Sequence, residues 1–282
     1  MTLNPLSPLM YEPLVRAALL EDLGRAGDIT TDAIVPAEKP ASLMLRARQD
    51  GVIAGLDVAR CAFQTVSPDV RMEIARPDGS AVKPGDMIAT ISGPARALLT
   101  GERTALNFLC HLSGVATATA SLVAAVKGTH AQIVCTRKTT PGLRALEKYA
   151  VRAGGGGNHR FGLDDAVLIK DNHVAIAGGI RPAITRARAH AGHLVKIEVE
   201  VDTLAQLEEA LALGVDAVLL DNMTTAQLEQ AVAMTSGMAI TEASGRITVA
   251  TAPAIAATGV DLISVGWITH SSAALDIGLD DG

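Results

Sequence analysis

The second half of the chain alternates between short apolar runs and segments with the spacing of an amphipathic helix. Strands are expected at 132–136, 166–170, 195–201, 216–222, 239–244 and 261–266, and helices at 141–153, 180–191, 204–213, 225–234 and 250–257. Such alternation is typical of a parallel sheet with right-handed helical crossovers. Two successive helix-strand units, 203–221 and 224–242, resemble each other. Repeated units of this kind favour closure into a barrel over an open sheet.

The first hundred residues have a different pattern. Apolar and polar residues alternate at 42–48 and 70–75, a helix is expected at 56–66, and the turns PDGS and KPGD precede another apolar run at 87–93. These features indicate a mixed α and β module with antiparallel hairpins. A long helical stretch from 94 to 126, broken near Gly114, is expected to link it to the barrel. We therefore predict one domain at 1–113, joined by the tail 270–282, and a second at 114–269.

The helix expected at 141–153 has clear end signals. Thr140 is a candidate N-cap, Pro141 fits the first turn, and the glycines from Gly154 end the helix. The helix is expected to serve packing. Its apolar face is expected to hold Leu143, Leu146 and Ala150, with Arg144, Glu147, Lys148 and Arg152 outside that face.

Composition and charge restrict the function. The 282 residues suffice for a large α/β barrel or two domains, and the core must be aliphatic because aromatic residues make up only 2%. A net charge of −6 argues against nucleic-acid binding. The basic residues between Thr136 and His173 are therefore a local feature, and they suit a small anionic substrate.

Cysteine usage and the N-terminus point to a reducing compartment. Cys61, Cys110 and Cys135 lie far apart in apolar stretches, which favours buried, reduced thiols over a metal site. The N-terminus lacks the pattern of a signal peptide, and no uninterrupted apolar run approaches the length of a membrane span. We expect a cytoplasmic protein with no membrane partner.

Polar residues or glycines stand where each expected strand ends. In a β/α barrel, reactive groups lie at the C-terminal ends of the strands. The agreement across six strands therefore indicates a functional site at that edge. The residues concerned are Arg137 and Lys138, Lys170 and Asp171, Glu200, Asp221, Glu242 and Ser244, and Gly266.

The segment 195–201 places three apolar residues on one face and Lys196, Glu198 and Glu200 on the other. The charged face is expected to point into the barrel, where carboxylates need a partner. A structural ion pair between Lys196 and Glu198 is one explanation. Glu200, nearest the strand end, is the better functional candidate.

Structural alternatives exist for the other candidates. Asp221 could cap the helix that begins near Thr225, and Lys170 could pair with Asp171. Arg137 and Lys138 could be surface charges, but they precede a helix N-terminus, which attracts anions. The glycine run at 154–157 is either a flexible loop or a place where the backbone approaches a ligand. Ser244, Gly245 and Gly266 form either turns or a phosphate site on backbone N–H groups.

Several segments together resemble the quinolinate phosphoribosyltransferase family. These are TRKTTPGLRALEKYAVRAGGGGNHRFGL, IKDNH, EVEV, LLDN, EASG and ISVG, in that order, with EDLGRAGDITT and GERTALNFLCHLSGVAT before them. The resemblance covers nearly the whole chain. It implies a type II phosphoribosyltransferase, an α/β protein with an incomplete, seven-stranded β/α barrel and an N-terminal α/β sandwich domain. The expected reaction joins quinolinate to phosphoribosyl pyrophosphate and yields nicotinate mononucleotide, pyrophosphate and carbon dioxide, a step of NAD biosynthesis.

The resemblance also implies the roles of particular residues. The acids at two strand ends would lie near the ribose hydroxyls and Mg²⁺, the expected cofactor. An arginine of GERTALN would reach the site of a neighbouring subunit, which implies a homodimer. Arg246 and Trp267 depart from the family's usual small residues and put the shape of the phosphate pocket in question. The implied anion-binding residues are Thr136, Arg137, Lys138, His159, Arg160 and Lys170, the acids Glu200 and Asp221, the phosphate-binding segment Ser244, Gly245, Arg246 and Gly266, and the arginine in trans Arg103.

Three other functions remain open on the residues alone. A Schiff-base aldolase could use Lys170 as its amine. A related pyrophosphorylase found with molybdate transporters is closer, although the NHR and IKDNH segments favour the quinolinate enzyme. A non-catalytic binding module would have to bury its inward carboxylates without a ligand or metal.

Overall fold

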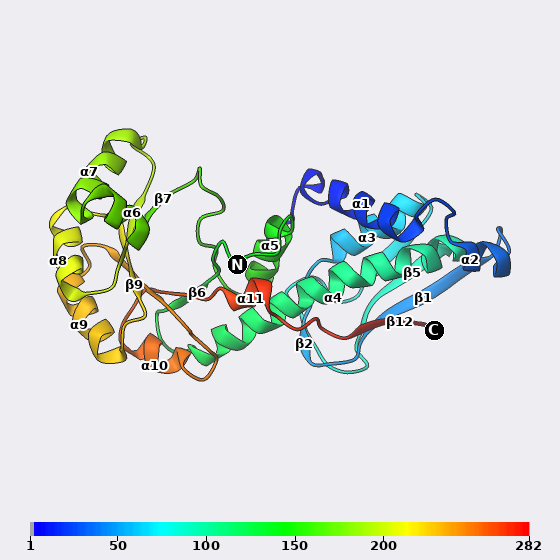
Figure 1. The fold of residues 1–282 in the computed structure, drawn as a ribbon. Coiled ribbons are helices and arrows are strands. Elements are labelled where there is room, and N and C mark those ends of the chain that lie inside the picture. Colours follow the sequence, from blue (N-terminus) through cyan, green and yellow to red (C-terminus); the bar gives the residue numbers. More distant parts are fainter. Residues whose placement is uncertain (1–2, 282) are drawn as a thin grey trace. The chain divides into compact units, whose positions relative to one another are not determined.

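The computed structural model describes residues 3–281, and it divides into two compact units. Unit 1 comprises Met1–Ala120, Thr140–Gly155 and Thr269–Gly282, and unit 2 comprises Ser121–Thr139 and Gly156–Ile268. Each is described by itself. The elements of both are labelled along the chain in Figure 1.

Unit 1 is built on an antiparallel sheet with strand order β12-β1-β5-β3. The C-terminal strand pairs with β1, so that Leu45 lies opposite Leu279. The alternating segments at 42–48 and 70–75 and the apolar run at 87–93 thus correspond to three strands of one sheet. The strands are β1 (Pro40–Ala47), β3 (Arg71–Ile74), β5 (Met87–Pro94) and β12 (Ile277–Asp281), with a separate ribbon of β2 (Gly51–Val52) and β4 (Ala81–Val82).

Helices pack around this sheet. The helix expected at 56–66 is present with the same bounds, and it buries Leu56, Val58 and Phe63. Its first backbone N–H groups, of Gly55 and Leu56, donate to Asp78. The helical elements are η1 (Pro8–Met10), α1 (Glu12–Leu23), α2 (Ile29–Ile34), α3 (Leu56–Val66), α4 (Ala95–Ala125) and α5 (Arg144–Ala153).

Helix α4 is continuous, so the expected break near Gly114 is wrong. Its 31 residues run through Gly114 without interruption. A Cβ atom at this glycine would collide with the backbone carbonyl oxygen of Ala273. The glycine therefore serves close packing against the C-terminal segment and not a change of direction.

Helix α4 is also long and apolar enough to cross a membrane by length and composition, the only such helix in residues 3–281. Half of its most apolar window is buried inside the protein, including Leu109, Leu112 and Val115. The core helix of a globular protein passes the same test. The apolar side chains of α4 thus have packing partners within the fold.

Helix α5 differs from the expectation at both its start and its faces. It begins at Arg144 with Leu143 as the N-cap, so the prediction that Thr140 caps it is wrong. Glu147 and Lys148 are buried, not outside the packed face, with 0% and 2% exposure. Glu147 accepts hydrogen bonds from the Thr140 backbone N–H, at 3.0 Å, and from His111 Nε2, at 2.9 Å. These bonds explain why a carboxylate can be buried there.

In the described residues, unit 2 holds a parallel sheet of six strands in the order β6-β11-β10-β9-β8-β7. An isolated parallel bridge joins Val134 to Gly157 beyond β6. The expected incomplete, seven-stranded barrel is thus represented by six strands and one bridge. The strands are β6 (Gln132–Val134), β7 (Val167–Ile169), β8 (Ile197–Val201), β9 (Ala217–Asp221), β10 (Ile240–Ser244) and β11 (Leu262–Ser264).

The helices of unit 2 alternate with these strands as the sequence predicted. The two similar units found in the sequence both begin with a capping box, Thr203 with Gln206 and Thr224 with Gln227. Because Thr224 caps the following helix, the alternative cap by Asp221 is wrong. The helices are α6 (Asp171–Ala177), α7 (Ile180–His190), α8 (Leu204–Ala212), α9 (Thr225–Thr235), α10 (Ala252–Ala257) and α11 (Trp267–His270), of which α11 extends past the end of unit 2.

Candidate active site

A cavity of about 380 Å³ in unit 2 lies at the C-terminal ends of its parallel strands. Most of the candidate residues from the sequence line it together, although they come from distant segments. The lining residues are Thr136, Arg137, Lys138, His159, Arg160, Leu168, Lys170, Glu200, Leu219, Asp221, Glu242, Ser244 and Ser264.

Two arginines hold unsatisfied donors at this cavity. The Nε atoms of Arg137 and Arg160 are buried and find no hydrogen-bond partner among residues 3–281. Arg160 is fixed through Nη1, which donates to the Ala166 carbonyl at 3.1 Å. Burial and then the nearby Arg137 lower the pKa of Arg160. Two crowded guanidinium groups with free donors form a site for an anion.

Lys138 follows Arg137 in the loop after β6. Its backbone N–H donates to Thr136 Oγ1 at 3.0 Å, which turns the chain at the end of the strand. A Cβ atom at Gly266 would lie 2.8 Å from Lys138 Cδ. The glycine after β11 therefore leaves room for the lysine side chain.

The acids at the ends of β8 and β9 lie in the same cavity. Glu200 Oε2 is 3.8 Å from Lys170 Nζ, so Lys170 pairs with Glu200 and the alternative pairing with Asp171 is wrong. Burial raises the pKa of Glu200, Lys170 opposes that effect, and the charge of Asp221 adds to it. Glu200 and Asp221 offer the oxygen ligands that Mg²⁺ prefers, so these residues fit the expected ion.

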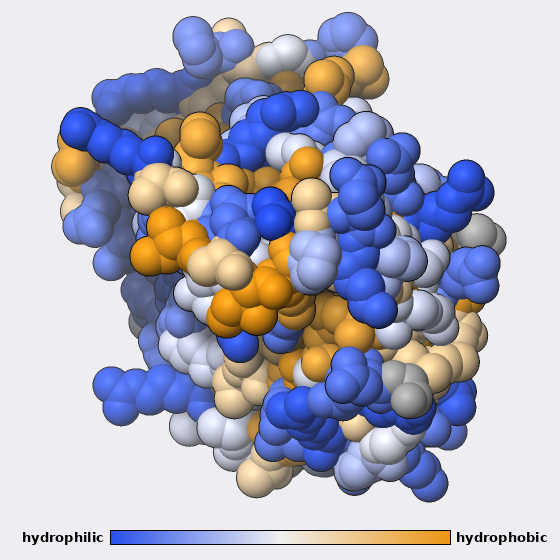
Figure 2. All heavy atoms as spheres, turned by 90° about the vertical axis from the view of Figure 1, so that its right-hand side faces the viewer, coloured by the Kyte–Doolittle hydropathy of each residue, from blue (hydrophilic) through white to orange (hydrophobic). Residues whose placement is uncertain are grey.

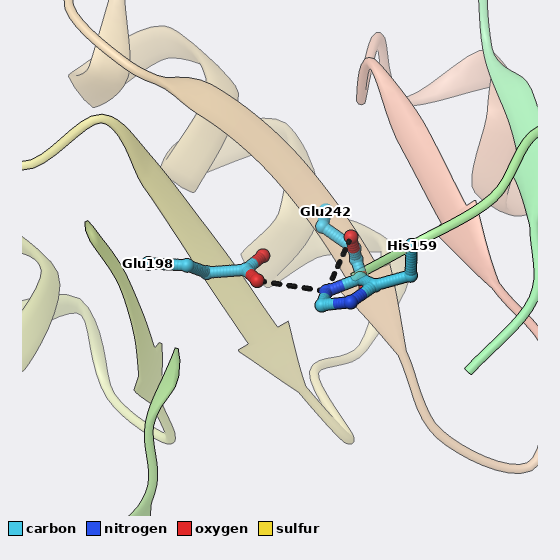
Figure 3. A group of neighbouring side chains, drawn as sticks. All are labelled: His159, Glu198 and Glu242. Atoms are coloured by element: carbon cyan, nitrogen blue, oxygen red, sulfur yellow. Dashed lines mark hydrogen bonds and ion pairs between the residues drawn. The ribbon is translucent and has the colours of Figure 1, made fainter. Parts of the chain in front are cut away.

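A second group of titratable side chains lies deeper between the strands (Figure 3). His159 Nε2 is 2.8 Å from Glu198 Oε2 and 3.6 Å from Glu242 Oε2. Glu242 is 1% exposed, and neither of its oxygens has a hydrogen-bond partner in the described chain. Burial and the negative charge of Glu198 raise its pKa to about 7. The ligand atoms of the three residues lie within 4.8 Å of one another, which could also hold a metal ion.

Sequence reasoning noted Glu242 with Ser244 at the strand-end edge, but it assigned no binding or catalytic role to Glu198 or Glu242. The ion pair considered between Lys196 and Glu198 is wrong, because Lys196 bonds to Asp216 and Glu198 bonds to His159. The alternation along β8 did predict that Glu198 and Glu200 share the inner face. The same alternation in β10 places Glu242 on one face with Ser244, and that signal could have identified it.

The loops after β10 and β11 form the last part of the site. Ser244 lines the cavity, whereas Gly245 and Arg246 are exposed. Gly245 has φ +147°, and a Cβ atom there would lie 3.0 Å from Asn222 Oδ1. Trp267 Nε1 donates to the Ile247 carbonyl at 2.9 Å and so ties the two loops together. Trp267 therefore has a structural role in this region.

Arg103 and the cysteines lie elsewhere. Arg103 is an exposed residue of α4 in unit 1, beside a cavity of about 340 Å³ that also contains Asn107 and His111. No cysteine forms a disulfide bond in the described residues, as expected. Only Cys135 is fully buried; Cys61 and Cys110 are half-buried.

Cations and acids grouped at the C-terminal edge of a parallel sheet define an anion-binding enzyme of the α/β barrel class. Comparisons with known proteins identify the family. The models for the quinolinate phosphoribosyl transferase N-terminal and C-terminal domains match residues 28–113 and 115–280. The chain therefore belongs to the quinolinate phosphoribosyltransferase family.

Individual relatives agree with this assignment. The chain is 48% identical to the nicotinate-nucleotide pyrophosphorylase [carboxylating] of Mycobacterium leprae, with 94% of this chain and 95% of the relative covered. It is 44% identical to a probable enzyme of the same name from Bacillus subtilis, over 96% and 93% of the two chains. The structure of the nicotinate-nucleotide pyrophosphorylase from Francisella tularensis matches with a TM-score of 0.94 at 38% identity, covering 99% of both chains. The family resemblance noted in the sequence is thus confirmed, and the aldolase and binding-module alternatives are not supported.

Proposed function

We propose that the cavity of unit 2 joins quinolinate to phosphoribosyl pyrophosphate, and that the chain thereby acts as a quinolinate phosphoribosyltransferase in NAD biosynthesis. The products are nicotinate mononucleotide, pyrophosphate and carbon dioxide. One observation carries the proposal: two buried guanidinium Nε atoms, without a hydrogen-bond partner among residues 3–281, lie in one cavity with two lysines and two half-buried acids. Both reactants are polyanions, and such a cavity provides cations for their charges.

The cations divide by geometry. A guanidinium group matches a carboxylate with two parallel hydrogen bonds, so Arg137 and Arg160 suit the two carboxylates of quinolinate. Lys138 and Lys170 act as point charges toward phosphate oxygens. The backbone of Ser244–Arg246 and Gly266, with Thr136 nearby, completes the proposed binding surface. The glycines in these two loops allow a 5-phosphate to approach the backbone N–H groups.

The chemistry requires no protein nucleophile. The ring nitrogen of quinolinate attacks the anomeric carbon of the ribose as pyrophosphate departs through an oxocarbenium-like state. Glu200 and Asp221 orient the ribose and stabilise its developing positive charge. These two acids would also hold Mg²⁺, which would neutralise negative charge on the pyrophosphate.

Decarboxylation follows from the product of that first step. The quaternised pyridinium ring accepts the electron pair left when the bond to the adjacent carboxylate breaks and carbon dioxide leaves. A proton then replaces the carboxylate on the ring carbon. The enzyme's contribution is positioning and electrostatics.

The assembly proposed is a homodimer in which Arg103 reaches the partner's cavity. Exposed apolar side chains on unit 1 support an interface there: Leu20 is 69% exposed, Ile29 70% and Ile34 74%. Figure 2 shows apolar groups among charged ones on the side of the molecule where α2 lies in Figure 1. Exposed apolar surface of this kind marks a protein contact. We also propose a cytoplasmic location and a domain boundary near Ser113.

The function is tested by mixing the protein with quinolinate, phosphoribosyl pyrophosphate and Mg²⁺ and measuring released carbon dioxide and nicotinate mononucleotide. Nicotinate in place of quinolinate is expected to react poorly, because it lacks the second carboxylate for Arg137 and Arg160. The Glu229→Gln variant, altered at an exposed position of α9, serves as the matched control. No carbon dioxide from quinolinate, or equal turnover of nicotinate, would contradict the proposal.

A further inference from the structure

Both ring nitrogens of His159 are already engaged within the chain. Nε2 faces Glu198 Oε2 at 2.8 Å, and the backbone N–H of Arg160 donates to Nδ1 at 2.7 Å. A backbone N–H is always a donor, so Nδ1 must be the unprotonated nitrogen and Nε2 carries the hydrogen. The imidazole therefore presents neither nitrogen to a substrate, although the ring lines the cavity.

From this geometry we propose that Glu198 and His159 are positioning residues for Arg160. Glu198 accepts the Nε2–H and thereby selects the tautomer whose Nδ1 restrains the Arg160 backbone. Arg160 is then held at two points. Its backbone N–H bonds to His159, and its guanidinium Nη1 donates to the Ala166 carbonyl. Its Nε stays buried with no partner among residues 3–281 and ready for a carboxylate. The proposal rests on the proposed function, in which that carboxylate belongs to quinolinate.

The buried Glu242 gives this arrangement its second support. Its nearest oxygen is 3.6 Å from the same Nε2, too far for the hydrogen bond that Glu198 makes at 2.8 Å. One Nε2–H cannot serve two carboxylates equally. Figure 3 shows the two carboxylates approaching the ring nitrogen from different strands, with Glu198 on β8 and Glu242 on β10. Glu198 is thus the residue that orients the ring.

A transition-metal ion on His159, Glu198 and Glu242 is the rival explanation of the cluster. The three donors suit such an ion, because imidazole and carboxylate ligate Zn²⁺. However, a metal on Nε2 would leave the hydrogen on Nδ1, where it would face the Arg160 N–H. Metal-bound histidines donate their second N–H to an acceptor, and here that position holds a donor. The metal and the restraint on Arg160 therefore exclude each other.

The two histidine variants with amide side chains separate positioning from direct binding. In His159→Asn the amide oxygen can take the place of Nδ1 and accept the Arg160 N–H, whereas in His159→Gln the amide overlays Nε2 and leaves that N–H without an acceptor. We expect His159→Asn to keep the KM for quinolinate within about 3-fold and His159→Gln to raise it about 10-fold, as for the loss of one hydrogen bond. The kcat should change less than KM in both. Equal effects of the two variants would overturn the proposal.

The tautomer is measured directly by heteronuclear NMR of ring-labelled histidine in the protein without substrates. Hydrogen on Nε2 is expected in the wild type. In Glu198→Ala the ring can turn away from the Arg160 N–H, so that preference should be lost, and the control Glu229→Gln should show no change. Hydrogen on Nδ1, or one equivalent of zinc in the purified protein by elemental analysis, would overturn the proposal. If Glu198→Ala does not fold, the histidine pair still decides. Because the NMR needs no turnover, a wild-type protein inactive on quinolinate would contradict the proposed function and leave the tautomer result intact.

Discussion

At the scale of single residues, the unusual feature of this protein is Glu242, a carboxyl group inside a sheet without a hydrogen-bond partner in the described chain. Burying an ionised carboxylate costs more than burying the neutral acid, so the fold favours protonation. Glu198 adds to that preference by its charge, and His159 opposes it. Glu242 therefore links the stability of the barrel to pH.

We predict that Glu242→Gln changes stability in a pH-dependent way. The pKa of Glu242 is raised from 4.5 to about 7 in the folded state. Its contribution to the unfolding free energy is therefore fully present below pH 4.5 and is lost as the pH rises to about 7. The loss is about 3 kcal/mol, because each tenfold change in proton affinity corresponds to about 1.4 kcal/mol. Because Gln stays neutral, the unfolding free energy of the variant should rise relative to that of the wild type as the pH increases over this range.

Urea unfolding at several pH values measures the difference in unfolding free energy between the wild type and Glu242→Gln. Titrating groups that do not interact with Glu242 cancel in that difference. Glu229→Gln, an exposed substitution, should show a flat difference. A flat difference for Glu242→Gln as well would show that burial does not raise the pKa of Glu242 in the folded state.

A second prediction at this scale concerns Arg137. Replacing it by Ala removes a guanidinium whose Nε is buried at the cavity. We expect kcat/KM to fall about 100-fold or more, equivalent to about 2–4 kcal/mol of transition-state stabilisation, as for the loss of one preorganised donor. Arg181→Ala, an exposed arginine of α7, is the control. Near-normal turnover by Arg137→Ala in the carbon dioxide assay would remove it from the proposed machinery.

The residues of the site were predictable where a local pattern placed them at a strand end. Lys170 and Asp221 each follow an apolar run, Glu200 lies on the charged face of an alternating strand, and all three line the cavity. The partners of these residues were not predictable, because pairing depends on which strands become neighbours. Thus Lys196 was paired with Glu198 on sequence proximity, whereas the sheet register brings it to Asp216.

At the scale of elements, the same division between local and distant information holds. The helix at 56–66 was predicted with its bounds because its apolar spacing, its glycine start and its end are all local. The start of helix α5 was predicted before its actual position at Arg144. The burial of Glu147 was also missed, because it depends on a hydrogen bond with His111 in another helix. The C-terminal strand β12 was not predicted as a strand, because its partner β1 lies more than two hundred residues earlier in the chain.

Helix α4 provides a prediction in which two physical effects oppose each other. Alanine is a better helix former than glycine by about 1 kcal/mol, so propensity alone would make Gly114→Ala stabilising. The new Cβ atom would collide with the Ala273 carbonyl and lie 3.1 Å from Ala274 Cα. We expect the collision to dominate, with a net destabilisation of about 1–3 kcal/mol. Urea unfolding measures it.

The control for propensity is Ala124→Gly at an exposed position in the last turn of the same helix, which should cost less than about 1 kcal/mol. A more stable Gly114→Ala protein would show that the C-terminal segment moves away easily. Close packing would then not explain the glycine at this position.

At the scale of the whole molecule, the cations proposed to bind the substrates fall into two sets. One lines the cavity of unit 2, and Arg103 stands on the exposed face of α4 in unit 1. The family assignment covers both units, so the resemblance that places Arg103 in the site of a partner applies to the full chain. If each cavity needs an arginine from the other subunit, activity requires the dimer, and each subunit alone is incomplete.

Mixing two inactive variants tests that dependence. Arg103→Ala lacks the donated arginine, and Arg137→Ala lacks one in its own cavity, so each homodimer has two defective sites. After subunits exchange, a mixed dimer contains one cavity with both defects and one with neither. Random pairing makes half of the dimers mixed, so we expect about one quarter of wild-type carbon dioxide release from the mixture. If Arg103 acted within its own chain, no intact site could arise and the mixture would stay inactive, while a monomer by sedimentation would rule out the exchange altogether.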